Sequence, residues 1–412
     1  MSQEQMEVWI DTAMTGPSPV MVGMLHHDHG NMRFQYSERW LKHPMRFSID
    51  PTLSLSDAAF YPNSSQGNFG IFLDSSPDRW GQTLMKRREA LEAKENNRPI
   101  KTLHAWDFLI GVQDQTRQGA LRFKSAKSDI FLENHPLSAP PLAQLRELEV
   151  VAKELSGKNI QNLQRLKAWL RVLVAPGASL GGARPKANFT DEDGSLWIAK
   201  FPAKDDDIDI AAWEMLAYQL AFHSGITLSP AKLLHLNNHH HTFSIKRFDR
   251  IGEQRVHYAS AMTLLQKESS EEGYYLDIAY FISSQGSVES RKKDLPQMFR
   301  RVIFNWLISN RDDHFRNHGF LLSPTGWQLS PAFDVNPNVD KQHHVLHLTE
   351  SGQSPDLENV LSSSPYYELN KDEAFKIYLE IQSVVNNWEK TARKLKISKA
   401  DIELMRPAFI SN

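Results

Sequence analysis

The sequence predicts an α+β fold in which a β-rich N-terminal module precedes a mainly helical C-terminal part. Three observations predict it: short apolar segments broken by turns up to about Phe72, a hairpin pattern further along, and helical periodicity over most of the chain beyond residue 258. Small strands joined by turns explain the N-terminal pattern, where the breaks fall at Gly16-Pro17, Gly30-Asn31 and Pro44.

Helical patterns follow this module. Ser76-Pro77-Asp78 offers a cap and a proline suited to the first helical position, before a helix that we expect to run to about Glu95. A second helix is expected near residues 103–110. The stretch 124–141 is rich in serine, proline and charge without periodicity, so it predicts a boundary between modules. We therefore expect three parts, over residues 1–124, 143–250 and 251–412.

The second part contains a hairpin that carries a glycine-rich loop. Two apolar segments flank a turn at Asp193-Gly194, and the second segment ends at Lys200. Residues 210–225 then have the spacing of an amphipathic helix stopped by Gly225, and residues 241–250 are typical of a further strand.

Composition excludes several classes of protein. The 412 residues carry 47 basic and 49 acidic side chains, so no overall field draws the chain to nucleic acid or to an anionic membrane. The absence of cysteine excludes disulfides, thiolate metal sites and cysteine nucleophiles. No window reaches the roughly 18 apolar residues of a membrane span, and the N-terminus lacks the pattern of a signal peptide. We expect a cytoplasmic protein without a membrane partner.

The segment from Asn310 to Asp334 carries the residue types needed for phosphoryl transfer. That reaction needs a carboxylate to accept the proton of the attacking hydroxyl, and an amide oxygen and a second carboxylate to hold Mg²⁺. Asp312 and Asn317 lie five residues apart, which is the spacing of the corresponding pair in protein-kinase catalytic loops, and Asp334 follows downstream. Each residue alone is an ordinary turn former, and their order along the chain is what predicts a kinase.

An ATP site also needs a loop over the phosphates, a strand lysine and a helix glutamate that holds this lysine. Lys200 and Glu214 stand in the required order, fourteen residues apart. The preceding loop could cover the phosphates through Gly177, Ser179, Gly181 and Gly182.

Other interpretations of the polar clusters remain open. A metal-assisted hydrolase could use Asp312, Asp313 and His314. The histidines at 239–241 favour an exposed turn over a metal site, because consecutive side chains point in different directions. Those at 343, 344 and 347 are expected to be solvated loop residues.

Taken together, several segments resemble the HipA family of toxin kinases from bacterial toxin–antitoxin modules. In the second half they are SLGGARPKA, WIAKFP, KRFDR, NRDDHFRNHGFLL and SPAFDVNP, in that order. The N-terminal third resembles the small module of full-length family members through WLKHPMRFSID, FLDSSPDRWGQTLMKRR and FLIGVQDQTRQGALRF. The resemblance covers about residues 8–400 and implies a bilobal protein-kinase-like fold.

By this resemblance, Asp312 is the catalytic base and Asn317 and Asp334 bind Mg²⁺. Lys200 contacts the ATP phosphates, and Glu214 positions it.

The resemblance also implies roles around these residues. The strand end from Lys246 to Phe248 passes the adenine as a hinge, and His314 supports the catalytic loop. The loop residues Ser179, Gly181 and Gly182 cover the nucleotide, and Ser179 matches a serine whose autophosphorylation switches family members off. Arg316 departs from the family pattern, which commonly has lysine there, so its contact with the transferring phosphate could differ.

The implied function is an ATP- and Mg²⁺-dependent protein serine/threonine kinase that acts as a toxin. Its expected partners are a HipB-like helix-turn-helix antitoxin, operator DNA through that antitoxin, and a protein substrate such as an aminoacyl-tRNA synthetase. Two alternatives remain open: a kinase-like co-repressor scaffold in an antitoxin–DNA complex, and a small-molecule or lipid kinase.

Overall fold

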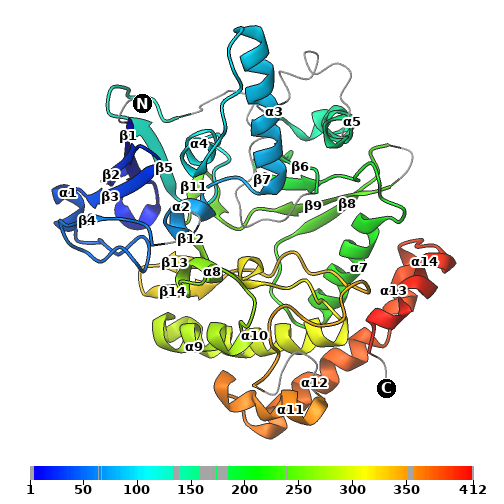
Figure 1. The fold of residues 1–412 in the computed structure, drawn as a ribbon. Coiled ribbons are helices and arrows are strands. Elements are labelled where there is room, and N and C mark those ends of the chain that lie inside the picture. The colour runs from blue at the N-terminus through cyan, green and yellow to red at the C-terminus, as the bar shows by residue number, and fades with distance from the viewer. Residues whose placement is uncertain are drawn as a thin grey trace. The chain divides into compact units, whose positions relative to one another are not determined.

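A computed structural model of the chain describes residues 4–63, 65, 67–132, 139–157, 170, 173, 184–237, 240–350 and 356–410 (Figure 1). The chain divides into two compact units. Unit 1 comprises Met1–Asp205 and Ser244–Ala259, and unit 2 comprises Asp206–Phe243 and Ser260–Asn412.

Unit 1 begins with an antiparallel sheet of five strands in the order β4-β3-β2-β1-β5. Apolar side chains alternate along its strands, and the inward-facing set, which includes Val8, Val22, Leu25, Phe34 and Phe123, is fully buried. The strands are β1 (Glu4–Ile10), β2 (Val20–Asp28), β3 (Asn31–Tyr36), β4 (Ala59–Phe60) and β5 (Leu121–Ser125).

Five helices belong to the described part of unit 1, and the longest, α3 (Arg79–Glu95), begins as expected near Asp78. The Asp78 carboxylate accepts a hydrogen bond from Gly81 N (2.9 Å), so Asp78 is the N-cap and Pro77 precedes the cap. The expectation of a proline at the first helical position was wrong. The other four helices in the described part of unit 1 are α1 (Glu38–Leu41), α2 (Gly70–Asp74), α4 (Ala105–Ile110) and α5 (Leu145–Ser156).

The predicted hairpin is present in unit 1. Strands β6 (Lys186–Thr190) and β7 (Leu196–Lys200) pair antiparallel and place Lys186 opposite Lys200. Gly194 supplies the left-handed conformation (φ 79°) that their turn requires. Strand β9 (Thr242–Lys246) is the neighbour of β7, and three short strands follow it: β10 (Arg250–Ile251), β11 (Gln254–Arg255) and β12 (Tyr258–Ser260).

Unit 2 is mainly helical. Its central helix α10 (Val288–Leu307) contacts α9 (Tyr275–Gln285) and α12 (Lys371–Val385), because its apolar face, including Phe299 and Ile303, is buried. The remaining helices are α7 (Ile210–His223), α8 (Ala261–Leu264), α11 (Leu357–Ser362), α13 (Trp388–Lys394) and α14 (Lys399–Met405). The strands are β8 (Ala231–Leu234) and the hairpin of β13 (Gly319–Ser323) with β14 (Gly326–Leu329).

This architecture confirms the predicted α+β class, with antiparallel sheets toward the N-terminus and helices toward the C-terminus (Figure 1). Within the residues that are described, no helix is both long and apolar enough to cross a bilayer.

Candidate active site

The predicted catalytic loop lies in unit 2 between α10 and β13. The helix ends at Leu307, and Asn310 N then returns to Asn305 O (2.8 Å), so the chain leaves the helix in a tight turn. At the other end of the loop, Phe315 is fully buried and its N–H donates to Ser270 Oγ (3.0 Å). These contacts fix both ends of the segment that carries Asp312.

Asp313 is the buried anchor of this loop. Its Oδ2 accepts hydrogen bonds from the Tyr275 hydroxyl (2.6 Å) and from Asn305 Nδ2 (2.8 Å), and it lies 2.8 Å from His318 Nε2. Burial by itself raises the pKa of Asp313, but the charge and hydrogen bond of His318 and the Tyr275 hydroxyl more than offset it, so the pKa lies below its ordinary value. The carboxylate therefore stays charged and holds three elements together.

Asp312, unlike the neighbouring Asp313, lies at the surface. Its side chain is 64% exposed, against 5% for Asp313, and it forms an ion pair with Lys341. An exposed carboxylate is accessible to a substrate hydroxyl, as a catalytic base must be.

This divergence counts against a hydrolase site made of Asp312, Asp313 and His314, because Asp313 is already engaged in its buried contacts. The described ranges contain no group of three or more His, Asp or Glu side chains that could hold a metal ion.

The predicted metal ligands offer oxygen atoms, the donors that Mg²⁺ prefers. Asn317 is buried, and its Nδ2 lies 3.5 Å from the main-chain oxygen of Asp312, which leaves Oδ1 as the atom suited to a cation. Asp334 adopts the left-handed region (φ 54°), two residues after Ala332, whose N–H donates to Thr227 O (2.9 Å). Both ligands belong to unit 2, and their donor set fits Mg²⁺.

Two of the three histidines after Asp334 are not solvated loop residues. His344 is buried, and burial together with the Arg311 guanidinium lowers its pKa to about 4. The ring of His347 lies 4.6 Å from that of Tyr274, and the main-chain N–H of His347 donates to Gly273 O (2.7 Å). The expectation was wrong for these two because main-chain contacts with the catalytic loop and with α9 draw the segment inward.

His240 and His241 of the earlier histidine cluster are half-buried. His241 Nδ1 lies 2.5 Å from Asp209, the residue that caps α7. His239 lies outside the described residues.

The nucleotide-binding residues predicted upstream are distributed over both units. In unit 1, Lys200 is buried at the end of β7, the Lys246 ammonium lies 3.3 Å from Asp193, and the ring of Phe248 lies 5.9 Å from that of Tyr258.

In unit 2, Glu214 is buried within α7. Its pairing with Lys200 stays a prediction. Ser179, Gly181 and Gly182 lie outside the described residues.

Lys186, the other cation near the predicted loop, has a structural partner. Its ammonium is 1% exposed and forms a buried ion pair with Asp78. Trp80 Nε1 donates to Lys186 O (3.0 Å), so the start of α3 is attached to β6 by both its cap and its first turn. Asp78, which caps α3, is therefore also part of the packing of the β6–β7 hairpin.

A second buried network surrounds the predicted hinge. Arg247 follows β9, and its guanidinium donates to Asp249, to Asn188 Oδ1 on β6 (3.0 Å) and to Thr116 O in the loop before β5. Gly119 N donates to Asp249 Oδ2 (2.8 Å). Gly119 has a positive φ of 73°, and a Cβ there would lie 3.2 Å from Tyr258 N, so glycine is required. The hinge segment is thus tied to the N-terminal module within unit 1.

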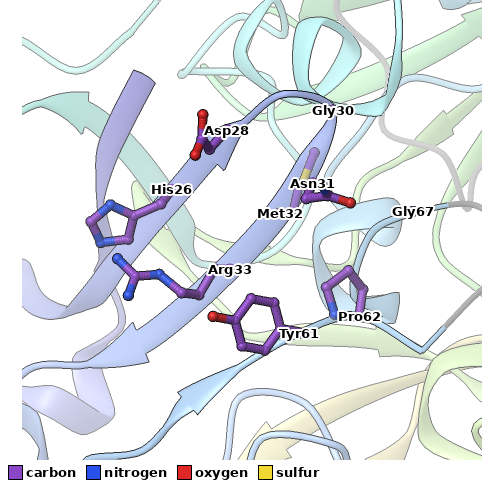
Figure 2. Close-up of a pocket in the computed structure, with 9 residues that line it drawn as sticks. All are labelled: His26, Asp28, Gly30, Asn31, Met32, Arg33, Tyr61, Pro62 and Gly67. Atoms are coloured by element: carbon purple, nitrogen blue, oxygen red, sulfur yellow. The ribbon is translucent and has the colours of Figure 1, made fainter. Parts of the chain in front are cut away.

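A cavity of about 610 Å³ lies on the outer face of the N-terminal sheet. Figure 2 shows His26 and Arg33 side by side on neighbouring strands, with Tyr61 opposite Arg33. None of the predicted site residues lines this cavity, so it is not the predicted nucleotide site.

Comparison with known protein families assigns both halves of the chain. The HipA-like C-terminal domain matches residues 178–396, which is more than half of the chain, and the HipA N-terminal domain matches residues 15–130. The chain belongs to the HipA family. The predicted resemblance is therefore confirmed.

Two known proteins that resemble this chain share little sequence identity with it. Y4dM of Sinorhizobium fredii, provisionally named as a kinase, is 26% identical over 157 residues, which cover 34% of this chain and 37% of that protein. The match thus spans well under half of that relative's length. HipA of Shewanella oneidensis MR-1, solved with HipB and operator DNA, has a similar fold, with a TM-score of 0.65 and 15% identity over 97% of this chain and 94% of that one.

Sequence reasoning missed the residues that hold the predicted catalytic loop of this HipA-family chain. It gave a supporting role to His314, whose Nδ1 is buried without a hydrogen-bond partner in the described part of the chain. The histidine that contacts the loop carboxylate is His318. The sequence held one sign of this contact. Asp313 and His318 lie five residues apart, the same spacing as Asp312 and Asn317. Tyr275 lies 38 residues earlier in the chain and Asn305 within the preceding helix, and neither left a sign in the sequence.

Proposed function

We propose that this HipA-family chain is an ATP- and Mg²⁺-dependent protein serine/threonine kinase that acts as the toxin of a toxin–antitoxin module. The observation that carries the proposal is the contrast within the catalytic loop. Asp313 is buried and fixed by three side chains, while Asp312 beside it is exposed. A rigid loop that presents one accessible carboxylate suits a reaction that depends mainly on positioning.

In this mechanism Asp312 would accept the proton of a substrate serine or threonine hydroxyl as its oxygen attacks the γ-phosphorus of ATP. Asn317 and Asp334 would hold Mg²⁺, which when bound would offset the negative charge of the ATP phosphates. Lys200 would neutralise the phosphates, with Glu214 orienting it, and the segment from Lys246 to Phe248 would border the adenine. We propose residues 1–124, 143–250 and 251–412 as the N-terminal module, small lobe and large lobe.

Regulation and partners extend the proposal. Phosphorylation of Ser179 would add close to two negative charges to a loop that must lie beside ATP phosphates, so the modified loop would bind nucleotide poorly. Shewanella HipA was solved with HipB and operator DNA, which supports a HipB-like helix-turn-helix antitoxin and operator DNA as partners here. An aminoacyl-tRNA synthetase is the proposed substrate, since its phosphorylation would stop the charging of tRNA.

The experiment is transfer of label from γ-labelled ATP into a bacterial protein extract, with and without Mg²⁺. We expect label in protein serine or threonine with the parent chain and loss of it in Asp312→Asn and Asp334→Asn. Asp340→Asn is the control, because Asp340 is an exposed carboxylate of the same unit with no partner among the described residues. Folding of each variant is checked by circular dichroism and thermal melting.

Each result has a definite meaning. Label found in lipid or small molecules would show that the phosphoryl acceptor is not a protein. Equal transfer by Asp312→Asn and the parent would refute the kinase proposal. Phosphopeptide mapping of the purified chain tests Ser179 separately, and the Asp312→Asn protein should carry no phosphate there.

A further inference from the structure

Lys341 contacts the proposed catalytic base and comes from the segment that follows Asp334. Its ammonium pairs with Asp312 Oδ1, and the two side chains are 42% and 64% exposed. The other carboxylate oxygen of Asp312 has no partner in the described part of the chain, so it is accessible to a substrate hydroxyl.

The main chain of Lys341 is held in place by the catalytic loop itself. Arg311 Nη1 donates to Lys341 O (2.6 Å), and Lys341 N donates to Asn338 Oδ1 (2.8 Å). Asn338 N in turn donates to Ser309 O (3.0 Å). Ser309 and Arg311, which precede Asp312 in the same loop, thus fix the position from which the ammonium reaches it.

The ion pair itself contributes little to folding. Exposed pairs of this kind stabilise proteins weakly and are screened by salt. For the same reason the ammonium can leave Asp312 at small cost when another anion enters the site. The hydrogen bonds that anchor the Lys341 main chain do not depend on the ammonium, so Lys341 would stay close to Asp312 after such an exchange.

We propose that Lys341 is a catalytic residue whose ammonium passes from Asp312 to the transferring phosphoryl group. The proposal rests on the kinase function proposed above. A general base must lie within about 2.6–3.2 Å of the hydroxyl whose proton it accepts, so a cation in contact with Asp312 lies next to the attacking oxygen and the γ-phosphorus.

The step balances as follows. The hydroxyl oxygen forms a bond to the γ-phosphorus, the bond from that phosphorus to the bridging oxygen of ADP breaks, and its electron pair stays on ADP. The hydroxyl proton goes to Asp312. Negative charge is spread over the three equatorial phosphoryl oxygens in the transition state, and the Lys341 ammonium stabilises it there. Until nucleotide arrives, the same ammonium neutralises the base.

The test compares Lys341→Met, Lys341→Arg and Lys341→Ala in label transfer from γ-labelled ATP to protein of a bacterial extract. We expect kcat to fall about 100-fold in Lys341→Met, the usual scale for loss of one group that stabilises transition-state charge, with a small change in KM for ATP. Lys341→Arg should retain more activity than Lys341→Met. Lys390→Met is the control, because Lys390 is exposed in the same unit without a partner among the described residues.

Chemical rescue separates a charge role from a structural one. Added propylammonium should restore part of the kcat of Lys341→Ala, while an uncharged alcohol of the same size should not. The inference is overturned if Lys341→Met keeps kcat within about threefold of the parent, or if Lys341→Arg and the amine restore nothing. If the parent transfers no more label than Asp312→Asn, the proposed kinase function itself has failed, which is a different result.

Discussion

Replacement of Asp249 by asparagine tests the buried network that ties the hinge segment to the N-terminal module. The carboxylate, 1% exposed, accepts hydrogen bonds from Arg247 Nε (2.8 Å) and Nη2 (2.6 Å), from Gly119 N (2.8 Å) and from Arg250 Nη1 (2.8 Å). Asparagine keeps the shape of the Asp249 side chain but removes its negative charge. Its NH₂ group would face one of the N–H groups that now donate to the carboxylate. The guanidinium of Arg247, which is fully buried, would lose its counter-charge.

The magnitude follows from this burial. Removing one partner of a buried ion pair costs about 3–5 kcal/mol, because the other charge stays buried. Arg247 keeps its bonds to Thr116 O and Asn188 Oδ1, so we expect the lower end of that range, about 3 kcal/mol. For a unit of this size, each kcal/mol lowers Tm by about 2–4 °C, so Asp249→Asn should melt about 6–12 °C below the parent.

The assay is urea unfolding of the full chain with Asp249→Asn, Arg247→Met and the double variant. Because the two side chains share one interaction, the double variant should be more stable than the sum of the single losses predicts. Asp193→Asn is the matched control, since Asp193 is exposed and its contacts with Lys246 and Ser195 lie at the surface, where only a small loss of stability is expected. A loss below 1 kcal/mol in Asp249→Asn, or additive losses in the cycle, would refute the reasoning.

Three further predictions concern other buried groups. Asp313→Asn should lower kcat in label transfer by at least tenfold and also lower the melting temperature, because it removes the anchor of the catalytic loop. Burial lowers the pKa of His257 from 6.5 to about 4, so the unfolded chain binds that proton more tightly and stability falls as the pH drops from about 6.5 to about 4. This pH-dependent loss of stability should reach about 3 kcal/mol. In His257→Leu, unfolding measured at pH 7 and pH 4 should lack this contribution. Lys186→Met should destabilise by about 3 kcal/mol, and addition of Asp78→Asn, which removes the charge but keeps an N-cap oxygen, should recover part of that loss in the same urea assay.

Local patterns predicted the elements of this fold well. The hairpin of β6 and β7, helix α7 and helix α3 were expected within a few residues, because alternation, amphipathic spacing and capping are properties of neighbouring residues. The start of α3 was misread by two positions, since only the hydrogen bond from Gly81 N decides that Asp78 caps it.

Contacts between distant residues were beyond the sequence. Lys186 follows the glycine-rich loop in the sequence, but its partner Asp78 lies over a hundred residues earlier in the chain. His344 was expected in solvent, yet its loop packs against the catalytic loop. Spacing located Asp312 and Asn317 in one segment, but spacing does not indicate which carboxylate of an adjacent pair is buried.

The adjacent aspartates separate two requirements of a catalytic loop. Asp313 is buried among Tyr275 of α9, Asn305 of α10 and His318, which directly precedes β13, so its carboxylate holds the backbone of the loop in place. Asp312, one residue away on the same backbone, is therefore presented to solvent on a support that does not need its carboxylate. It follows that Asp312→Asn should abolish transfer with Tm unchanged, whereas Asp313→Asn should lower both. Stability losses of equal size in the two variants would mean that the loop is held by something other than the Asp313 cluster.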